Sequence, residues 1–404
     1  MGVLNSIKND FFGVCMPLAY YFCMLPSDVL ENRNERFRLF YDVYAGAIYM
    51  IAIFCHASQL VKLYQILADE NFIFDELIRN YIITLYHFNA LIKCIFLRGK
   101  VSSRIYRTII EYENKIYQSQ NESLISIYKL TLSSTRNTKR YYLAGIVLVV
   151  VFYIAAPAFR DPYYIQRENE TIIVPQVPLS SWTLVDDKYW YAFAWTSAAG
   201  TYLSIFFVTT DLICYSFIAF STCQLDILQY YINNFHEHSQ EIMDQTGCTK
   251  TESFRIFQRE CLKTHQDIIS YVKALNGSLK KIMMLDFLPS SIQLAGIIFQ
   301  MMTNLSVIQC TLLGHFVCTL IARIFIYCNS ADNLAAQSQN IATAWYQIDW
   351  TELPYDVRKN IVLCIARSQK PLTITIGDFQ AISLGTFLVI LKGTYSYMML
   401  LTTV

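Results

Sequence analysis

The chain has 404 residues, of which 54% are hydrophobic, 15% aromatic and only 16% charged. Soluble domains carry about 25% charged residues, so the composition argues against an ordinary soluble enzyme and indicates a membrane protein. Lysine plus arginine (32) nearly equals aspartate plus glutamate (31), so the chain as a whole has no basic field that would attract nucleic acid.

Long stretches without a formal charge predict the membrane spans, because a bilayer core of about 30 Å needs roughly 20 helical residues. Seven spans follow in chain order: 43–61, 80–97, 141–159, 189–210, two helices within 287–322 that turn at 303–306, and one from 379 to the C-terminus. The second is the most polar, since Arg79 precedes it and Lys93 lies inside it. We therefore expect an all-α membrane protein with seven transmembrane helices.

Two loops predict the orientation of these spans. Residues 98–140 hold nine basic and three acidic residues, which is typical of a cytoplasmic loop. Residues 161–190 hold two basic and five acidic residues and include Asn169-Glu170-Thr171, a glycosylation acceptor that is used only on the outer side. With seven spans, these loops predict a cytosolic N-terminus and an extracellular C-terminus, the reverse of a G-protein-coupled receptor.

The predicted organisation follows from these spans. It comprises a cytosolic N-terminus (1–38), spans one to six (39–329) with an extracellular loop (160–189) and cytoplasmic helical loops (98–140 and 226–282), cytoplasmic anchor helices (330–374) and a last helix (375–404). The apolar run 11–25 has the length of a signal peptide, but no small-residue cleavage site follows it. A re-entrant or interfacial helix fits that run better.

The cytoplasmic loops have the periodicity of helices. Apolar residues step by three or four at Leu225, Leu228, Ile232 and Phe235, and again from Phe254 to Val272. We expect the membrane helices to continue below the bilayer into a cytoplasmic anchor layer. Their apolar faces could be buried within the chain or against neighbouring chains, so oligomerisation is a hypothesis.

Nothing in the sequence indicates catalysis. The GxSxG, HExxH, P-loop and GxGxxG motifs are absent, and none of the 12 cysteines forms a CxxC pair, so we predict no enzyme activity, no metal site and no cofactor.

Five ionisable residues lie singly within apolar segments: Lys93, Asp211, Asp286, Arg323 and Lys392. Each is costly in lipid and needs a partner or water. Asp211 either pairs with a basic residue such as Arg323 or faces the cytosol from an extended helix, and the sequence leaves both interpretations open.

The outer halves of spans two, three, four and six are rich in aromatic and aliphatic residues. A pocket between them would accept a small, volatile, lipophilic molecule by shape and dispersion, with one or two hydrogen bonds. The candidates, each of which could instead pack between helices, are Ile82, Leu85, Tyr86, Asn89, Val151, Phe152, Ala155, Trp195, Ala199, Tyr202, Gln309, Leu313 and Phe316.

The last helix has one stripe that is small and mildly polar in the middle and aliphatic at its outer end. It is formed by Thr386, Val389, Gly393, Ser396, Leu400 and Val404. Four such stripes around an axis would make a narrow wetted pore closed by a ring of leucine. Packing of the small residues on a neighbouring helix is the alternative.

The C-terminal motifs resemble the signature of the insect odorant receptors. They comprise Trp350, Leu353-Pro354, Arg367-Ser368-Gln369-Lys370-Pro371-Leu372, Thr375, Gly377, Ser383-Leu384, Thr386-Phe387, Leu391-Lys392 and Thr394-Tyr395-Ser396-Tyr397, with weaker likeness at Asp211 and at 265–268. The resemblance implies the inverted seven-span topology and an odorant-gated, non-selective cation channel in the plasma membrane of olfactory neuron dendrites. It also implies a tetramer in which a ligand-tuned subunit joins a shared coreceptor.

The resemblance further implies roles for single residues. Leu400 and Val404 fall at the hydrophobic gate, with Thr403 beside the pore and Gly393 and Ser396 earlier on the same helix. The chain lacks the coreceptor's long insertion before span five, so it is similar to a ligand-tuned subunit. A gustatory-type receptor channel, a G-protein-coupled receptor and a transporter are the alternatives, and the Arg-Ser-Gln-Lys-Pro and Tyr-Ser-Tyr motifs favour the odorant receptor.

Overall fold

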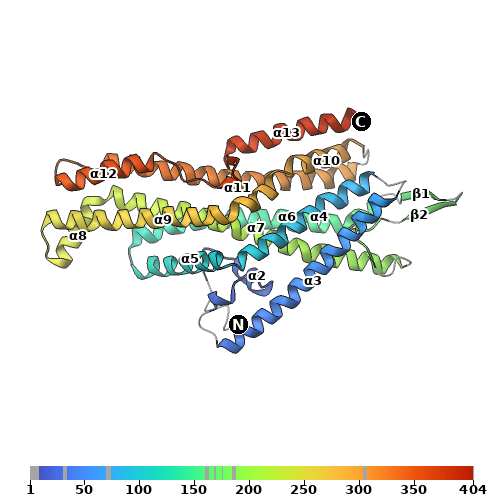
Figure 1. Cartoon of the computed structure of the whole chain (residues 1–404), viewed down its shortest axis with the longest axis horizontal. Helices are drawn as coiled ribbons and strands as arrows, with labels where there is room; N and C mark the ends of the chain where they lie inside the picture. The colour runs from blue at the N-terminus through green and yellow to red at the C-terminus, as the bar shows by residue number, and fades with distance from the viewer. Residues whose placement is uncertain are drawn as a thin grey trace.

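The computed structural model of the chain describes residues 9–30, 34–69, 74–159, 163–167, 170–174, 176–183, 188–303 and 307–403. Long helices run side by side along the long axis of the molecule (Figure 1). The all-α class is confirmed, because the described strands form only two short hairpins.

The elements follow in chain order. They are α2 (Cys15–Tyr21), η1 (Ser27–Val29), α3 (Glu35–Ala68), α4 (Phe74–Leu97), α5 (Lys100–Gln118), α6 (Glu122–Ala155), η2 (Ala156–Phe159), β1 (Tyr163–Arg167), β2 (Glu170–Val174), α7 (Tyr189–Asn233), α8 (Phe235–Thr246), α9 (Lys250–Phe287), α10 (Ser290–Thr303), α11 (Val307–Gln347), α12 (Tyr355–Ser368), β3 (Thr375–Ile376), β4 (Gln380–Ala381) and α13 (Leu384–Thr403).

Six segments in the described part are long and apolar enough to cross a membrane: α3, α4, α6 with η2, α7, α9 with α10, and α11. The apolar stretch of α13, Leu384–Leu400, is shorter, and with it the count reaches the seven spans expected from the sequence. The predicted turn at 303–306 falls mainly on residues outside the described ranges.

Helix α7 is the central helix of the bundle. Of its most apolar stretch, 89% is buried inside the chain, against 17% for α6. An apolar helix with little lipid contact must be enclosed by other helices, and α7 packs against α4, α6, α9 and α11. The central position explains why α7 has an apolar run on every face rather than a stripe.

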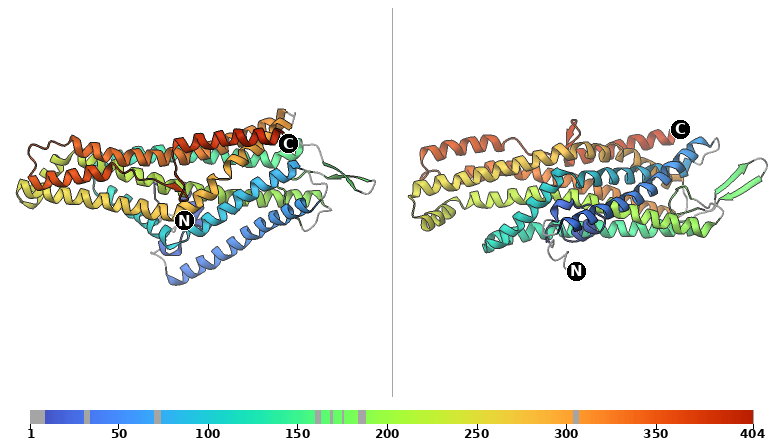
Figure 2. Two further views of the ribbon diagram at one scale, coloured as in Figure 1. Left: turned by 45° about the horizontal axis from the view of Figure 1, so that its top comes forward. Right: turned by 60° about the horizontal axis from the view of Figure 1, so that its bottom comes forward.

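One end of the bundle consists of the C-terminal parts of α7 and α11 and the N-terminal part of α9 together with α8 and α12 (Figure 2). Phe235 is central here, because its ring lies 5.2 Å from that of Phe257 and 6.1 Å from that of Trp345. Leu225, Leu228, Ile232 and Phe235 are at most 1% exposed, as their helical spacing predicts. The amphipathic faces are therefore buried within this chain.

The N-terminal segment packs into the bundle near its middle. The backbone N–H groups of Asp10 and Phe11 donate to the Glu113 carboxylate at 2.8 and 3.0 Å, and Lys139 donates to the Phe11 carbonyl at 2.7 Å. Helix α2 follows directly and contacts α7. This segment fills a gap between helices, which is how its apolar side chains avoid water.

The two hairpins lie at different places along the bundle. Strands β1 and β2 pair antiparallel at the end where α13 also terminates (Figure 1). Strands β3 and β4 precede α13, and Gly377 between them has a φ of +57° and donates its N–H to the Lys280 carbonyl at 2.8 Å. A Cβ at Gly377 would lie 3.2 Å from Met284 Sδ, so glycine allows the base of α13 to rest on α9.

Candidate ligand cavity and buried charge cluster

A cavity that is partly open to the outside lies between α4, α6, α7 and α11, and its empty space, the open part included, is about 780 Å³. Its lining is mainly aliphatic and aromatic: Ile83, Tyr86, His87, Tyr142, Ile146, Val149, Val150, Tyr153, Ile154, Leu179, Thr196, Ser197, Gly200, Thr201, Ser204, Phe207, Phe316, Thr319, Leu320 and Arg323. A lining of this composition is typical of sites for small lipophilic ligands. We call this space the main cavity.

Most of the hydroxyl groups on the wall of the main cavity donate to their own helix. Thr196 and Ser197 donate to the carbonyls of Ala192 and Phe193 at 2.8 and 2.7 Å, and Thr201 donates to the Ser197 carbonyl at 2.8 Å. A hydroxyl bonded in this way offers a ligand lone pairs but not its proton. The wall is therefore less polar than its composition suggests.

A second cavity adjoins the first and contains about 510 Å³ of empty space. Ile83, Val149, Tyr153 and Phe316 line both, so the two are separated only by side chains. The second cavity adds residues of α10 and the polar groups of Arg79 and Gln300.

Several residues predicted from the sequence to surround a ligand line these cavities. Tyr86 and Phe316 line the main cavity, and Ile82, Phe152, Leu313 and Phe316 line the second one. Their roles in ligand binding remain predictions, since a lining position shows access and not contact with a ligand.

The other candidates lie elsewhere. Asn89 donates to the Asp286 carboxylate, Tyr202 to the Ile48 carbonyl at 2.8 Å, and Gln309 to the Phe159 carbonyl at 3.2 Å. Five more lie at packing or surface positions: Trp195 contacts Phe54 edge to face, Ala199 is buried, Val151 is 54% exposed on the outside of α6, and Leu85 and Ala155 are half-buried. None of these eight lines either cavity, because helix rotation directs them to other neighbours.

The main cavity has polar lining residues that sequence reasoning did not propose. His87 is buried and its Nδ1 lies 2.9 Å from the side-chain Nε2 of Gln59, which fixes the imidazole against α3. Tyr142 and Arg323 line the cavity and also interact with the buried carboxylate of Asp211, as described below. Lone polar residues inside apolar spans are the signal that could have indicated all three.

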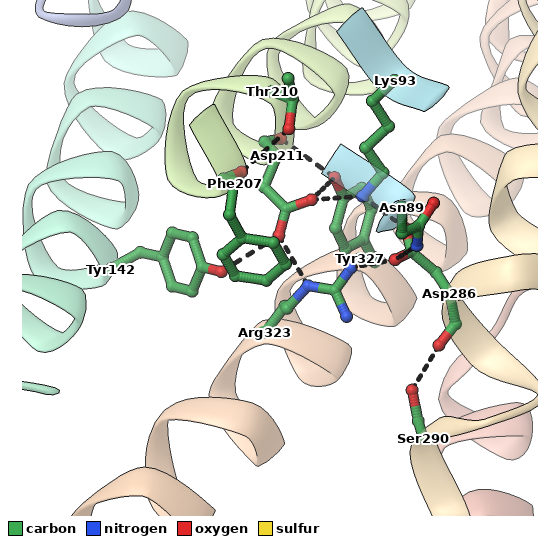
Figure 3. A network of polar contacts seen from close by, with 10 residues as sticks. All are labelled: Asn89, Lys93, Tyr142, Phe207, Thr210, Asp211, Asp286, Ser290, Arg323 and Tyr327. Carbon is green, nitrogen blue, oxygen red and sulfur yellow. Dashed lines mark hydrogen bonds and ion pairs between the residues drawn. The ribbon is translucent and has the colours of Figure 1, made fainter. Parts of the chain in front are cut away.

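Four charged residues from four helices meet beside the main cavity, and we call them the charge cluster (Figure 3). Lys93 of α4 and Arg323 of α11 each pair with both Asp211 of α7 and Asp286 of α9. The Arg323 Nε–Asp211 Oδ2 distance is 2.6 Å and the Lys93 Nζ–Asp286 Oδ2 distance is 2.5 Å. The ion pair of Asp211 with Arg323, one of the two sequence interpretations, is thus confirmed, and it extends to four residues.

Neutral groups add further hydrogen bonds to the charge cluster. Asn89 donates to Asp286, Tyr142 donates to Asp211 Oδ2 at 3.1 Å, and Tyr327 donates to the Asp211 backbone carbonyl at 3.0 Å. All four charged side chains are at most 4% exposed. Two cations balance two carboxylates, so burial leaves no net charge in the bundle.

The predicted pore stripe of α13 divides between two environments. Gly393 faces α10, because a Cβ there would lie 3.3 Å from Ser291 Oγ. Ser396 is exposed and Leu400 is 62% exposed at the edge of the bundle. Thr403 ends α13, while Val404 and Asn169 lie outside the described residues.

The long apolar helices, the main cavity and the buried charge cluster define a multi-pass helical membrane protein with a largely apolar internal cavity. The family follows from comparison: the family model described as "7tm Odorant receptor" matches residues 73–395, and the chain belongs to this family of odorant receptors.

Individual relatives agree with this placement. The chain is 29% identical over 185 residues to Odorant receptor Or2 of Anopheles gambiae (46% of this chain and 48% of that protein) and 29% identical over 199 residues to Odorant receptor 10 of Aedes albopictus (49% of each). The chain thus spans about half the length of the curated relatives it matches. The insect olfactory receptor OR5 of Machilis hrabei, solved in complex with eugenol, has the same fold, with a TM-score of 0.75, 14% identity and coverage of 100% of this chain and 98% of that one.

Proposed function

We propose that the chain is the ligand-tuned subunit of an odorant-gated, non-selective cation channel, and not an enzyme. The observation that carries the proposal is the main cavity, a largely apolar space lined by four membrane-length helices in a member of the odorant receptor family. A small lipophilic molecule would gain free energy there mainly from dispersion and from leaving water.

The last helix supports the channel part of this proposal. Helix α13 lies at the edge of the bundle against α10, with Leu400 largely exposed in the single chain. An apolar side chain exposed near a helix end is available to meet its counterparts in an assembly, and a ring of such side chains excludes water and ions. The proposed assembly is a heterotetramer with the shared coreceptor.

We propose the plasma membrane of olfactory neuron dendrites as the location, with bilayer lipid around the spans, the N-terminus in the cytosol and the C-terminus outside. The hairpin β1–β2 and the end of α13 lie at the same end of the bundle (Figure 1). This arrangement supports a location of loop 160–189 and the C-terminus on the same side of the membrane.

The test is current recording in cells that express the chain with and without a coreceptor, challenged with a panel of neutral odorants. The proposal expects odorant-evoked inward current that requires the coreceptor and persists when G-protein signalling is blocked. Loss of the current under that block would support a G-protein-coupled receptor instead. Tastant responses without odorant responses would support a gustatory-type channel.

A further inference from the structure

Arg323 is the one cationic side chain that lines the main cavity in the described part of the chain. Its guanidinium carbon lies 5.1 Å from the centre of the Phe207 ring and 5.6 Å from that of Tyr86, and both rings also line the cavity. Arg323 therefore belongs both to the charge cluster and to the wall that a ligand would touch.

The nitrogens of Arg323 are not all used by the charge cluster. Nε donates to Asp211 Oδ2 and Nη2 donates to Asp286 Oδ1, whereas Nη1 has no hydrogen-bond partner among the described residues (Figure 3). The side chain is only 4% exposed. Because Arg323 lines the main cavity, this nitrogen can donate to a water molecule or to a polar atom of a ligand that enters the cavity.

The charge balance of the cluster restricts what that acceptor can be. Lys93 and Arg323 are already neutralised by Asp211 and Asp286. A ligand with an ionised carboxylate would add an unbalanced negative charge beside them and would be penalised by desolvation. A neutral acceptor, such as a ketone, ester or ether oxygen, can accept the hydrogen bond and leave the balance unchanged.

We propose that Arg323 Nη1 donates a hydrogen bond to a neutral oxygen of the ligand in the main cavity, which makes Arg323 the residue that selects oxygen-bearing lipophiles over hydrocarbons and over carboxylates. This inference rests on the proposed odorant-binding function. A hydrogen bond to a charged donor corresponds to a preference of about ten-fold to about a hundred-fold over a ligand of equal shape that lacks the oxygen.

The experiment compares matched ligands on the full chain with its coreceptor. The probes are 2-octanone, nonane and heptanoate, together with the strongest agonist of the odorant panel and its analogue in which methylene replaces the oxygen. The wild type is expected to respond to the oxygen-bearing members at concentrations at least about ten-fold lower than to the hydrocarbons, with heptanoate weakest.

Two double variants keep the charge cluster neutral overall. They separate the effect of the Arg323 hydrogen-bond donor from the effect of removing a cation. Arg323→Met with Asp286→Asn removes the hydrogen-bond donor, because methionine has no N–H, and the ketone-to-alkane potency ratio should fall close to one. Lys93→Gln with Asp286→Asn removes one cation and the same carboxylate but keeps Arg323, and the ratio should persist. Tyr86→Phe tests the neutral phenol at the same wall and should leave most of the ratio in place.

The outcomes separate the two proposals. A wild type gated by odorants that shows equal potency for ketone and alkane, or an unchanged ratio in Arg323→Met with Asp286→Asn, overturns the role of Arg323 while odorant gating stands. If that variant does not reach the surface, Arg323→Lys replaces it, since a single nitrogen must serve both carboxylates; an undiminished ratio there also overturns the role. No odorant current from surface-expressed wild type with coreceptor overturns the function itself.

Discussion

Asp211 of α7 and Arg323 of α11 are 112 residues apart in sequence and share a buried ion pair, with Arg323 Nε donating to Asp211 Oδ2 at 2.6 Å. Together with Lys93 and Asp286, this pair joins α4, α7, α9 and α11 at one level of the bundle. The charge cluster therefore fixes the relative positions of three cavity-lining helices and of the helix that supports the base of α13.

The first prediction concerns the charge balance of this cluster. Lys93→Met alone leaves two carboxylates with one cation, and breaking a buried pair in this way costs about 3–5 kcal/mol. Most of the variant should fail to reach the cell surface, as measured by surface biotinylation.

Balance can be restored at a second site. Lys93→Met combined with Asp211→Asn removes one charge of each sign and should recover a large part of the surface signal. Lys93→Met combined with Asp378→Asn should not, because Asp378 is 86% exposed and pairs with Lys280 rather than with the charge cluster. Equal surface levels for all three variants would mean that the cluster does not stabilise the fold.

The second prediction concerns the volume of the main cavity. Gly200 lines the cavity, and a Cβ at that position would lie 3.8 Å from Leu179 Cδ2, which is ordinary contact. Gly200→Val should therefore fold but occupy ligand space, and overpacking of about 1–3 kcal/mol predicts a potency loss of about ten-fold for bulky agonists and less for small ones.

The matched control for this substitution is Gly46→Val. Gly46 is an exposed helical glycine of α3 with nothing within 4 Å of the added Cβ. Dose–response curves for agonists of increasing size should be parallel to wild type for Gly46→Val. A size-independent loss in Gly200→Val would place the ligand outside the main cavity.

The third prediction concerns the side of the membrane on which loop 160–189 lies. Asn169 is in the sequon Asn169-Glu170-Thr171, and an extracellular loop should be glycosylated there. Asn169→Gln should remove a glycosidase-sensitive shift on a gel. An antibody tag in this loop that stains only permeabilised cells would reverse the topology.

The fourth prediction concerns Cys248 and Cys364, which lie at the end of the bundle opposite to the β1–β2 hairpin (Figure 1). Burial raises the pKa of the Cys364 thiol to about 11, so near neutral pH it stays protonated and reacts slowly. Cys248, half-buried between α8 and α9, should be alkylated first, as read by peptide mass spectrometry.

An impermeant maleimide adds the topological information. It should label Cys248 only after permeabilisation, since α8 lies at the end of the bundle opposite to the β1–β2 hairpin (Figure 1). Raising the pH towards 11 should increase the labelling of Cys364, because the thiolate is the reactive form. Labelling of Cys248 on intact cells would contradict a cytosolic anchor layer.

The sequence could predict those properties that depend on one helix alone. Helical spacing identified the buried faces at Leu225, Ile232 and Phe235, because a stripe along one helix needs no knowledge of its neighbours. The cost of charge in lipid singled out Lys93 and Arg323 one by one.

Properties that arise where helices cross were harder to predict. The four-residue charge cluster depends on how the helices are rotated relative to one another, and so does the position of Tyr142 in the lining of the main cavity. The spacing of apolar residues along α4, α6, α7 and α11 does not give this relative rotation. For the same reason Asn89, proposed for the ligand, instead donates to Asp286. Gly393 was placed on the pore stripe but faces Ser291, because small residues suit close helix packing equally well.

The last prediction concerns the proposed gate at Leu400. In the single chain Leu400 is 62% exposed near the end of α13, and its position one turn beyond the exposed Ser396 would bring it to the first aliphatic ring of a pore formed by several copies of this helix. A ring of apolar side chains a few ångströms wide excludes water, and replacing one member by a hydroxyl lowers that barrier.

Leu400→Ser should therefore raise the current in the absence of odorant, while Met398→Ser, at a half-buried position about 160° round the helix, should change it much less. Both variants are compared at equal surface expression, measured on the same cells, so that a folding defect is not mistaken for a gating effect. The ion selectivity of the leak current is a second test, because a leak through the pore should carry the same cations as the odorant-evoked current. Equal leak from the two variants, or none from Leu400→Ser, would mean that this face of α13 packs against another helix and that the constriction lies at a different position.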